Sequence, residues 1–207
     1  MKDYGYTKEE KDFLKKLNSP AKIQDYLNSI PFNFEKNGDT FMSPRRVVRD
    51  GTAHCMEGAM FAAAALEFHG YKPLVLDLRS VKKPFDYDHV LAVWKQDGHW
   101  GAISKTNHGV LRYREPVYKT IRELVMSFFH EYFLHSGEKT LREYSVPLNL
   151  NRFNKIEWRT SEEELWDIPG ELDSIKHHSI LSKKQIKNLR LADKIEIEIG
   201  KIVEFKK

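Results

Sequence analysis

The chain has 207 residues, of which 41% are hydrophobic and 12% aromatic, enough to bury the core of one domain. Its 34 basic and 30 acidic residues leave a net charge of +4, too small and too dispersed for a nucleic-acid-binding surface. No apolar run approaches the length of a membrane span, and a single cysteine excludes an internal disulfide framework.

The N-terminal stretch, residues 1 to 17, is charged throughout and lacks the apolar segment of a secretory signal. Together with the lone cysteine, this pattern predicts a protein of the reducing cytoplasm. We expect no metal and no cofactor, because no pair of Cys or His residues has the spacing of a metal site. Nothing in the sequence predicts an oligomeric state.

Two amphipathic helices are predicted near the N-terminus. Thr7 followed by Glu10 is typical of a capping box, which predicts a helix over residues 7 to 18. A second helix is expected from Ser19 to Leu27, with a proline near its start, and Pro31 ends it.

Residues 33 to 52 are polar and rich in turn residues, so we expect them to be mostly loop. This segment contains three arginines just before the cysteine: Arg45, Arg46 and Arg49. They could bind an acidic group of a substrate or depress the pKa of the thiol. The simpler interpretation is an ordinary solvated face.

Residues 55 to 69 are apolar on nearly all sides, which predicts a helix inside the domain that ends at Gly70. Three strands should follow, around residues 74 to 79, 89 to 96 and 99 to 104. The Asp97-Gly98 pair predicts a two-residue turn between the last two strands. In that register His89 faces Thr106 across the hairpin, and Ser104 is its diagonal neighbour.

A helix over residues 118 to 136 is rich in Phe and Tyr, which we expect to pack against the sheet. Residues 137 to 190 are irregular, with Trp158 and Trp166 as expected anchors. A short helix is predicted over residues 182 to 192. Strict alternation of isoleucine over residues 194 to 205 predicts a β-strand.

The order of these elements predicts an α+β fold, in which a central helix that carries the cysteine packs on an antiparallel β-sheet. Residues 1 to 136 are expected to form the core domain. Residues 137 to 207 are expected to form a C-terminal extension that packs on the core, with no role that the sequence assigns.

Cys55 and His89 are the residues that suggest chemistry. Cys55 stands at the predicted start of the buried helix, where unpaired N–H groups lower the pKa of a thiol and can stabilise an oxyanion. His89 opens a strand directly after an acidic loop, where it could serve as the base that a nucleophilic cysteine needs. The simpler interpretation makes Cys55 a small buried hydrophobic residue and each histidine a surface or hydrogen-bonded group.

The order of a cysteine at the head of an Ala-rich helix, a strand, a histidine that opens the next strand and a third strand resembles the transglutaminase-like superfamily, which has a papain-type cysteine-histidine site. Within residues 45 to 110, the resemblance lies in HCMEGA at 54 to 59, GYKP at 70 to 73, DHVLAV at 88 to 93 and GHW at 98 to 100.

The resemblance implies a catalytic Cys, His and Asp, with Cys55 as the nucleophile and His89 as the base. The family's Asp follows a Trp by four residues, and counting from Trp100 that position holds Ser104. A serine can orient the imidazole but brings no charge. Further candidates for an auxiliary role are Asp86, Asp88, Thr106 and His54.

The implied function is acyl transfer on a peptide or another amide-bearing substrate. Cys55 would form a thioester, which water or an amine then resolves. The alternative is a binding module that keeps the fold and has lost turnover, and Ser104 favours it. A third class, a basic protein that binds nucleic acid or a membrane surface, rests only on the excess of positive charge and the lysine-rich C-terminus, so neither partner is expected.

Overall fold

The computed structural model describes residues 4–206; the first three residues of the charged N-terminal stretch and Lys207 of the lysine-rich end lie outside it. The helices are α1 (Lys8–Lys16), α2 (Pro20–Ser29), α3 (Pro44–Asp50), α4 (Cys55–Phe68), α5 (Ile121–Phe129), α6 (Asp167–Ser174), α7 (Lys183–Lys187), α8 (Lys194–Gly200) and the 3-10 helix η1 (Leu150–Ile156). The strands are β1 (Leu74–Arg79), β2 (His89–Gln96), β3 (His99–Ile103), β4 (Arg114–Tyr118), β5 (Glu143–Ser145), β6 (Leu148–Asn149) and β7 (His177–Ser179).

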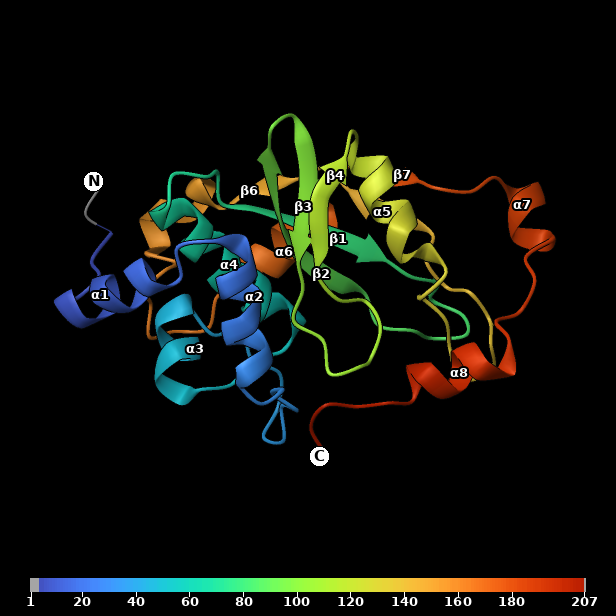
Figure 1. Cartoon of the computed structure of the whole chain (residues 1–207), viewed down its shortest axis with the longest axis horizontal. Helices are drawn as coiled ribbons and strands as arrows, with labels where there is room; N and C mark the ends of the chain where they lie inside the picture. Colours follow the sequence, from blue (N-terminus) through green and yellow to red (C-terminus); the bar gives the residue numbers. More distant parts are fainter. Residues whose placement is uncertain (1–3, 207) are drawn as a thin grey trace.

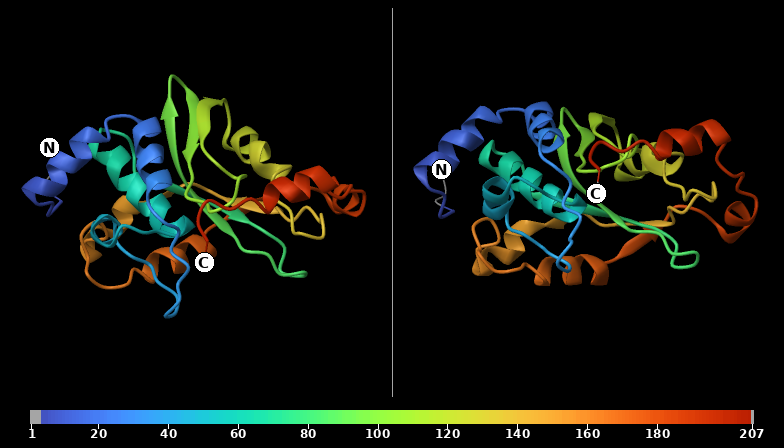
Figure 2. Two further views of the ribbon diagram at one scale, coloured as in Figure 1. Left: turned by 60° about the horizontal axis from the view of Figure 1, so that its bottom comes forward. Right: turned by 90° about the horizontal axis from the view of Figure 1, so that it is seen from below.

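The named strands form one sheet in the order β4-β3-β2-β1-β5-β7, and β6 also pairs with β1. Every pairing between them is antiparallel, which confirms the α+β class. Helices α1 to α4 gather on one side of this sheet and α5 covers the other (Figure 1). The arm that carries α7 and α8 lies at the end of the molecule opposite α1 (Figure 2).

The β2–β3 hairpin has the predicted register. Val93 pairs with Ala102 and Gln96 with His99, so Asp97 and Gly98 are the two turn residues. Both have positive φ, 49° and 82°, as a type I′ turn requires. Side chains along β2 therefore alternate between two cores: one on the side of α4 and one under α5.

The absence of a polar face on α4 follows from its position. Its residues from Met56 to Leu66 are all buried, because β1 and β2 cover one side of the helix and α1, α2 and α3 cover the other. Five alanines keep the helix slim enough for these close approaches (Ala59, Ala62, Ala63, Ala64 and Ala65). The predicted central helix on an antiparallel sheet is thus confirmed.

Residues 33 to 52 are not mostly loop as expected. Pro44–Asp50 forms α3, which begins at a Ser43 side chain that accepts a hydrogen bond from Arg46 N and ends at Gly51 with φ 62°. The N-cap serine followed by proline is a helix start signal, which the turn-rich composition around it outweighed in the sequence interpretation.

The C-terminal strand prediction is also wrong. Residues 194 to 200 form α8, where the side chain of Glu196 accepts a hydrogen bond from Asp193 N at 2.6 Å. Alternation predicts a strand only when a sheet edge is there to pair with it. Within residues 4–206, this segment contacts the rest of the chain through a single bridge between His108 and Val203.

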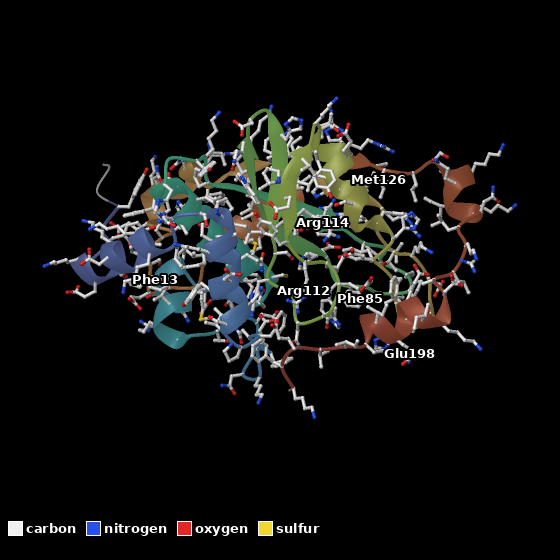
Figure 3. The ribbon with its side chains drawn as sticks, in the orientation of Figure 1. Phe13, Phe85, Arg112, Arg114, Met126 and Glu198 are labelled. Atoms are coloured by element: carbon white, nitrogen blue, oxygen red, sulfur yellow. The ribbon has the colours of Figure 1, made fainter. Side chains whose placement is uncertain are left out.

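The other predicted helices exist in shorter form. α5 covers nine residues of the range 118 to 136, because β4 occupies its beginning and the helix ends at the cap residue His130. Arg114 of β4 bonds to Ser127 of α5, which ties these neighbouring elements together (Figure 3). α7 is confined to Lys183–Lys187 of the predicted range 182 to 192.

Of the two expected tryptophan anchors, Trp158 is fully buried but Trp166 is 54% exposed and only packs edge-on against Phe41. The sheet also continues past residue 136, where the sequence suggested the end of the core, since β5 and β6 both pair with β1. None of the described helices has both the length and the apolarity to cross a membrane.

Candidate active site

The start of α4 is held by a reciprocal pair of caps. His54 Nδ1 accepts a hydrogen bond from Met56 N at 3.2 Å, and the buried carboxylate of Glu57 accepts one from His54 N at 3.0 Å. Glu57 also accepts hydrogen bonds from Thr40 Oγ1 and Met42 N, so the carboxylate joins the preceding loop to the helix. The first turn of α4 is therefore rigidly placed.

His54 serves this cap as a neutral ring. Its Nε2 lies 2.7 Å from the carbonyl oxygen of Thr40, which can only accept, and its Nδ1 accepts from a backbone N–H. Burial lowers the pKa of His54, but Cys55, Glu57 and the Thr40 carbonyl outweigh burial and raise it to about 9. A further proton would have to occupy Nδ1 and would displace the Met56 N–H, so protonation of His54 opposes the helix cap.

Cys55 is the first residue of α4 and is half-buried. Burial raises the pKa of its thiol, but hydrogen bonds and charge from His54 and His89 outweigh burial and leave the pKa well below its usual value. Because both nitrogens of His54 are already bonded, we attribute the lowering to His89. No residue among 4–206 accepts a hydrogen bond from Cys55 N.

His89 begins β2 and is 7% exposed. Its Nε2 lies 2.8 Å from Ser104 Oγ, just beyond the end of β3, which confirms the predicted diagonal contact. Ser104 Oγ donates its own proton to the carbonyl oxygen of Leu111 at 2.5 Å. The hydroxyl must therefore accept from His89 Nε2–H, and the lone pair on Nδ1 is left for Cys55.

Ser104 is itself fixed by an element far away in the sequence. The side-chain amide of Gln24, on α2, donates to the carbonyl oxygen of Ser104 and accepts from its N–H, both at 2.9 Å. These two bonds replace the backbone pairing that β3 loses where it ends. α2, α4 and β2 thus each hold one part of a Cys55–His89–Ser104 chain.

A cleft of about 690 Å³ opens on Cys55. Its wall combines the start of α4, the segment before β2, the middle of β1 and helix α6. Apolar side chains line part of it: Phe41, Met56, Val90 and Leu172. A bound molecule would therefore reach the thiol from the side on which the N–H groups of α4 begin.

The auxiliary residues named from the sequence have other partners. Thr106 Oγ1 accepts from His108 N and has no hydrogen bond to His89, because β3 ends at Ile103 before the two can pair. Asp88 Oδ1 accepts from the backbone and hydroxyl of Ser80. The side chain of Asp86 bonds to the hydroxyl of Thr140. Neither aspartate replaces Ser104 beside His89.

The three arginines before Cys55 form ion pairs away from the thiol. Arg45 bonds to Glu10, Arg46 to Glu164, and Arg49 to Asp50 and Glu162. They join α3 to neighbouring segments, so the interpretation as a structural face holds.

Two residues that build the site were not predicted from the sequence. Glu57 could have been found, since an acidic residue three positions after a helix cap is a capping-box signal. Gln24 had no signal, because it meets Ser104 across 80 positions of the sequence. No protein-family model matches this chain, and no curated protein matches it in sequence. Its function therefore has to be inferred from the geometry of the site.

Proposed function

We propose that this protein is an acyl-transfer enzyme that works through a thioester on Cys55, with the chemistry of the transglutaminase-like superfamily. The observation that carries the proposal is the alignment of Cys55, His89 and Ser104 at the head of α4, on the wall of a cleft. A structural cysteine needs neither a lowered thiol pKa nor a hydrogen-bonded imidazole.

The mechanism follows from the tautomer of His89. Nδ1 takes the proton of the Cys55 thiol, and the thiolate attacks the carbonyl carbon of an amide. The free N–H of Cys55 donates to the resulting oxyanion. As the tetrahedral intermediate collapses, His89 gives its proton to the leaving amine and a thioester remains. Water or an amine then attacks the thioester, with His89 again taking the proton.

The second candidate function is a binding module without turnover. Ser104 favours it, because a hydroxyl orients the imidazole without the charge by which an aspartate stabilises the imidazolium. Asp88 and Asp86, the nearest acidic residues in the chain, make their hydrogen bonds elsewhere. The two candidates differ in one measurable property, the nucleophilicity of Cys55 at neutral pH.

Alkylation by iodoacetamide from pH 5 to 9 separates them, and the single thiol makes the signal unambiguous. We expect the wild type to react at a rate that stays high well below pH 8. In His89→Ala that plateau should be lost. His99→Ala is the matched control, since His99 lies on the same hairpin but bonds only to Asp97 O. An ordinary thiol profile in the wild type would favour the binding module.

A further inference from the structure

The cleft beside Cys55 is acidic although the chain as a whole carries a net charge of +4. No lysine or arginine is among its lining residues, whereas five carboxylates are: Glu35, Asp39, Asp77, Asp88 and Asp173. Like charges gathered in a concave wall focus a negative potential and draw in cations. The charge pattern therefore concerns the ligand of the cleft and not the surface as a whole.

Three of these carboxylates converge. Asp77, Asp88 and Asp173 each offer one oxygen atom, and the three oxygens lie within 4.8 Å of one another. An alkylammonium group has three N–H donors in a tetrahedral arrangement. With charge-assisted bonds of about 2.8 Å, its three acceptors lie roughly 4.6 Å apart. The spacing of the carboxylate tripod fits this geometry.

Asp77 supplies the strongest evidence that a cation is missing. It is 2% exposed and lines the cleft from the middle of β1. Its Oδ2 accepts from His177 Nε2 at 3.0 Å, but no residue of the described chain donates a hydrogen bond to its Oδ1. A buried carboxylate oxygen without a donor is costly, so the site is incomplete without a ligand that donates.

The cation that the protein itself provides does not fill the gap. Arg79 lies 3.8 Å from both Asp77 and Asp173, and it is shared with Glu143 at the same distance. Burial raises the pKa of Asp77 to about 6, and the charge of Asp88 adds to this, although His177 and Arg79 lower it. The negative charge at the tripod is thus only partly balanced.

We propose that the tripod of Asp77, Asp88 and Asp173 binds the ammonium group of a lysine-like side chain, so that the cleft selects amide substrates that carry a primary ammonium. This inference rests on the proposed acyl transfer at Cys55. The bound ammonium is a recognition group and not the acyl acceptor, because three carboxylates keep it protonated and a protonated amine has no lone pair for attack on a thioester.

Charged thiol reagents test the proposal without a known substrate. We would compare the rates at which Cys55 reacts with three methanethiosulfonates, which carry an aminoethyl, a methyl or a sulfonatoethyl group. Each rate is divided by that of glutathione with the same reagent. We expect the cationic reagent to be favoured over the anionic one by about tenfold or more at low salt, and the preference to shrink at high salt.

The variants Asp88→Asn and Asp173→Asn remove charge from exposed positions of the tripod. Each should reduce the cationic preference about threefold, whereas Asp12→Asn, an exposed aspartate on α1, should leave it unchanged. A preference equal to that of glutathione, or one that survives both tripod variants, overturns the proposal. So does loss of the preference in micromolar Ca²⁺, which would show that the tripod is a metal site.

The source of the ammonium is tested by protection of Cys55 from the neutral reagent. Nα-acetyl-lysine methylamide should protect at lower concentrations than 1,5-diaminopentane if the ligand is a lysine side chain; the reverse order identifies a free amine. The proposed function fails separately. If the neutral reagent reacts slowly with wild type and His89→Ala alike, the acyl-transfer function is wrong, whatever the ratio between charged reagents.

Discussion

The hydroxyl of Ser104 decides which nitrogen of His89 faces the thiol. Because it gives its proton to Leu111 O, it can only accept from His89 Nε2–H. In Ser104→Ala the ring loses this partner, so we expect the rate of Cys55 alkylation at pH 7 to fall about tenfold to a hundredfold, equivalent to the roughly 1.5–3 kcal/mol of a hydrogen bond to a charged group.

The matched control for Ser104→Ala is Ser43→Ala. Ser43 is equally buried, and its hydroxyl caps α3 without touching His89. It should lose about 1 kcal/mol of stability and keep the alkylation profile. If Ser104→Ala reacts as fast as the wild type while urea unfolding shows the same loss as Ser43→Ala, Ser104 is only a structural residue.

His54 stands next to the nucleophile, yet its hydrogen bonds are those of a helix cap. Asparagine is a good N-cap residue, so His54→Asn should stay within about 0.5 kcal/mol of the wild type in urea unfolding, and His54→Ala should lose about 1 kcal/mol. Both should retain reactive Cys55. A folded His54→Asn protein with an unreactive thiol would instead make His54 the base.

At the scale of single residues, the sequence predicted Cys55, His89 and their contact with Ser104, because two local signals coincide there. A helix start places the thiol, and the Asp97-Gly98 turn sets the register that brings Ser104 diagonal to His89. Thr106 was misplaced because that register was extended beyond Ile103, where β3 ends. Turn geometry predicts pairing near a hairpin but not where the strands separate.

Among the elements, α4 depends most on close packing. A Cβ atom on Gly58 would lie 2.4 Å from Cβ of Lys105, whose ammonium caps the end of α2 through Leu27 O and Ile30 O. Gly58→Ala should therefore lose about 1–3 kcal/mol in urea unfolding, although alanine is the better helix former.

The control for Gly58→Ala is Gly170→Ala. Gly170 also lies inside a helix, α6, but nothing is within 4 Å of the position of its Cβ. There the helix propensity acts alone, and alanine should stabilise the protein by up to about 1 kcal/mol. Equal effects at the two positions would mean that Lys105 moves aside without cost.

Elements with strong local signals were predicted, and those that depend on distant partners were not. The capping box of α1 and the hairpin turn are complete within a few residues. The alternating isoleucines of α8 would favour a strand, but the conformation of such a segment depends on whether a sheet edge is within reach. Periodicity describes which side chains could share a face, not which surface will cover them.

At the scale of the molecule, the cleft brings together segments that are far apart in sequence. Asp77 comes from β1, Asp88 from the segment before β2 and Asp173 from α6. None of these aspartates follows a motif, so composition showed only a modest positive charge for the whole chain. The acidic cleft follows from the sheet order, since α6 reaches Asp77 only where β1 is central.

The same packing makes the stability of the whole molecule depend on pH through Asp77. Because the pKa of this carboxyl rises from about 4 in the unfolded chain to about 6 in the folded one, the folded state binds its proton more tightly. The stabilisation is complete below pH 4 and is lost as pH rises through 6. Asp77→Asn cannot titrate, so the unfolding free energy of the wild type minus that of the variant should fall by about 1–3 kcal/mol between pH 4 and 7.

Urea unfolding at half-unit pH steps measures this difference, and Asp12→Asn should give a flat curve over the same range. The sign also tests the ammonium site. Bound n-butylammonium favours the ionised carboxylate of the folded state, so a saturating concentration should lower the pKa of Asp77 and flatten the fall in wild type only. A difference that rises between pH 4 and 7 would mean that His177 and Arg79 already balance the buried charge, and the tripod would then need no further cation.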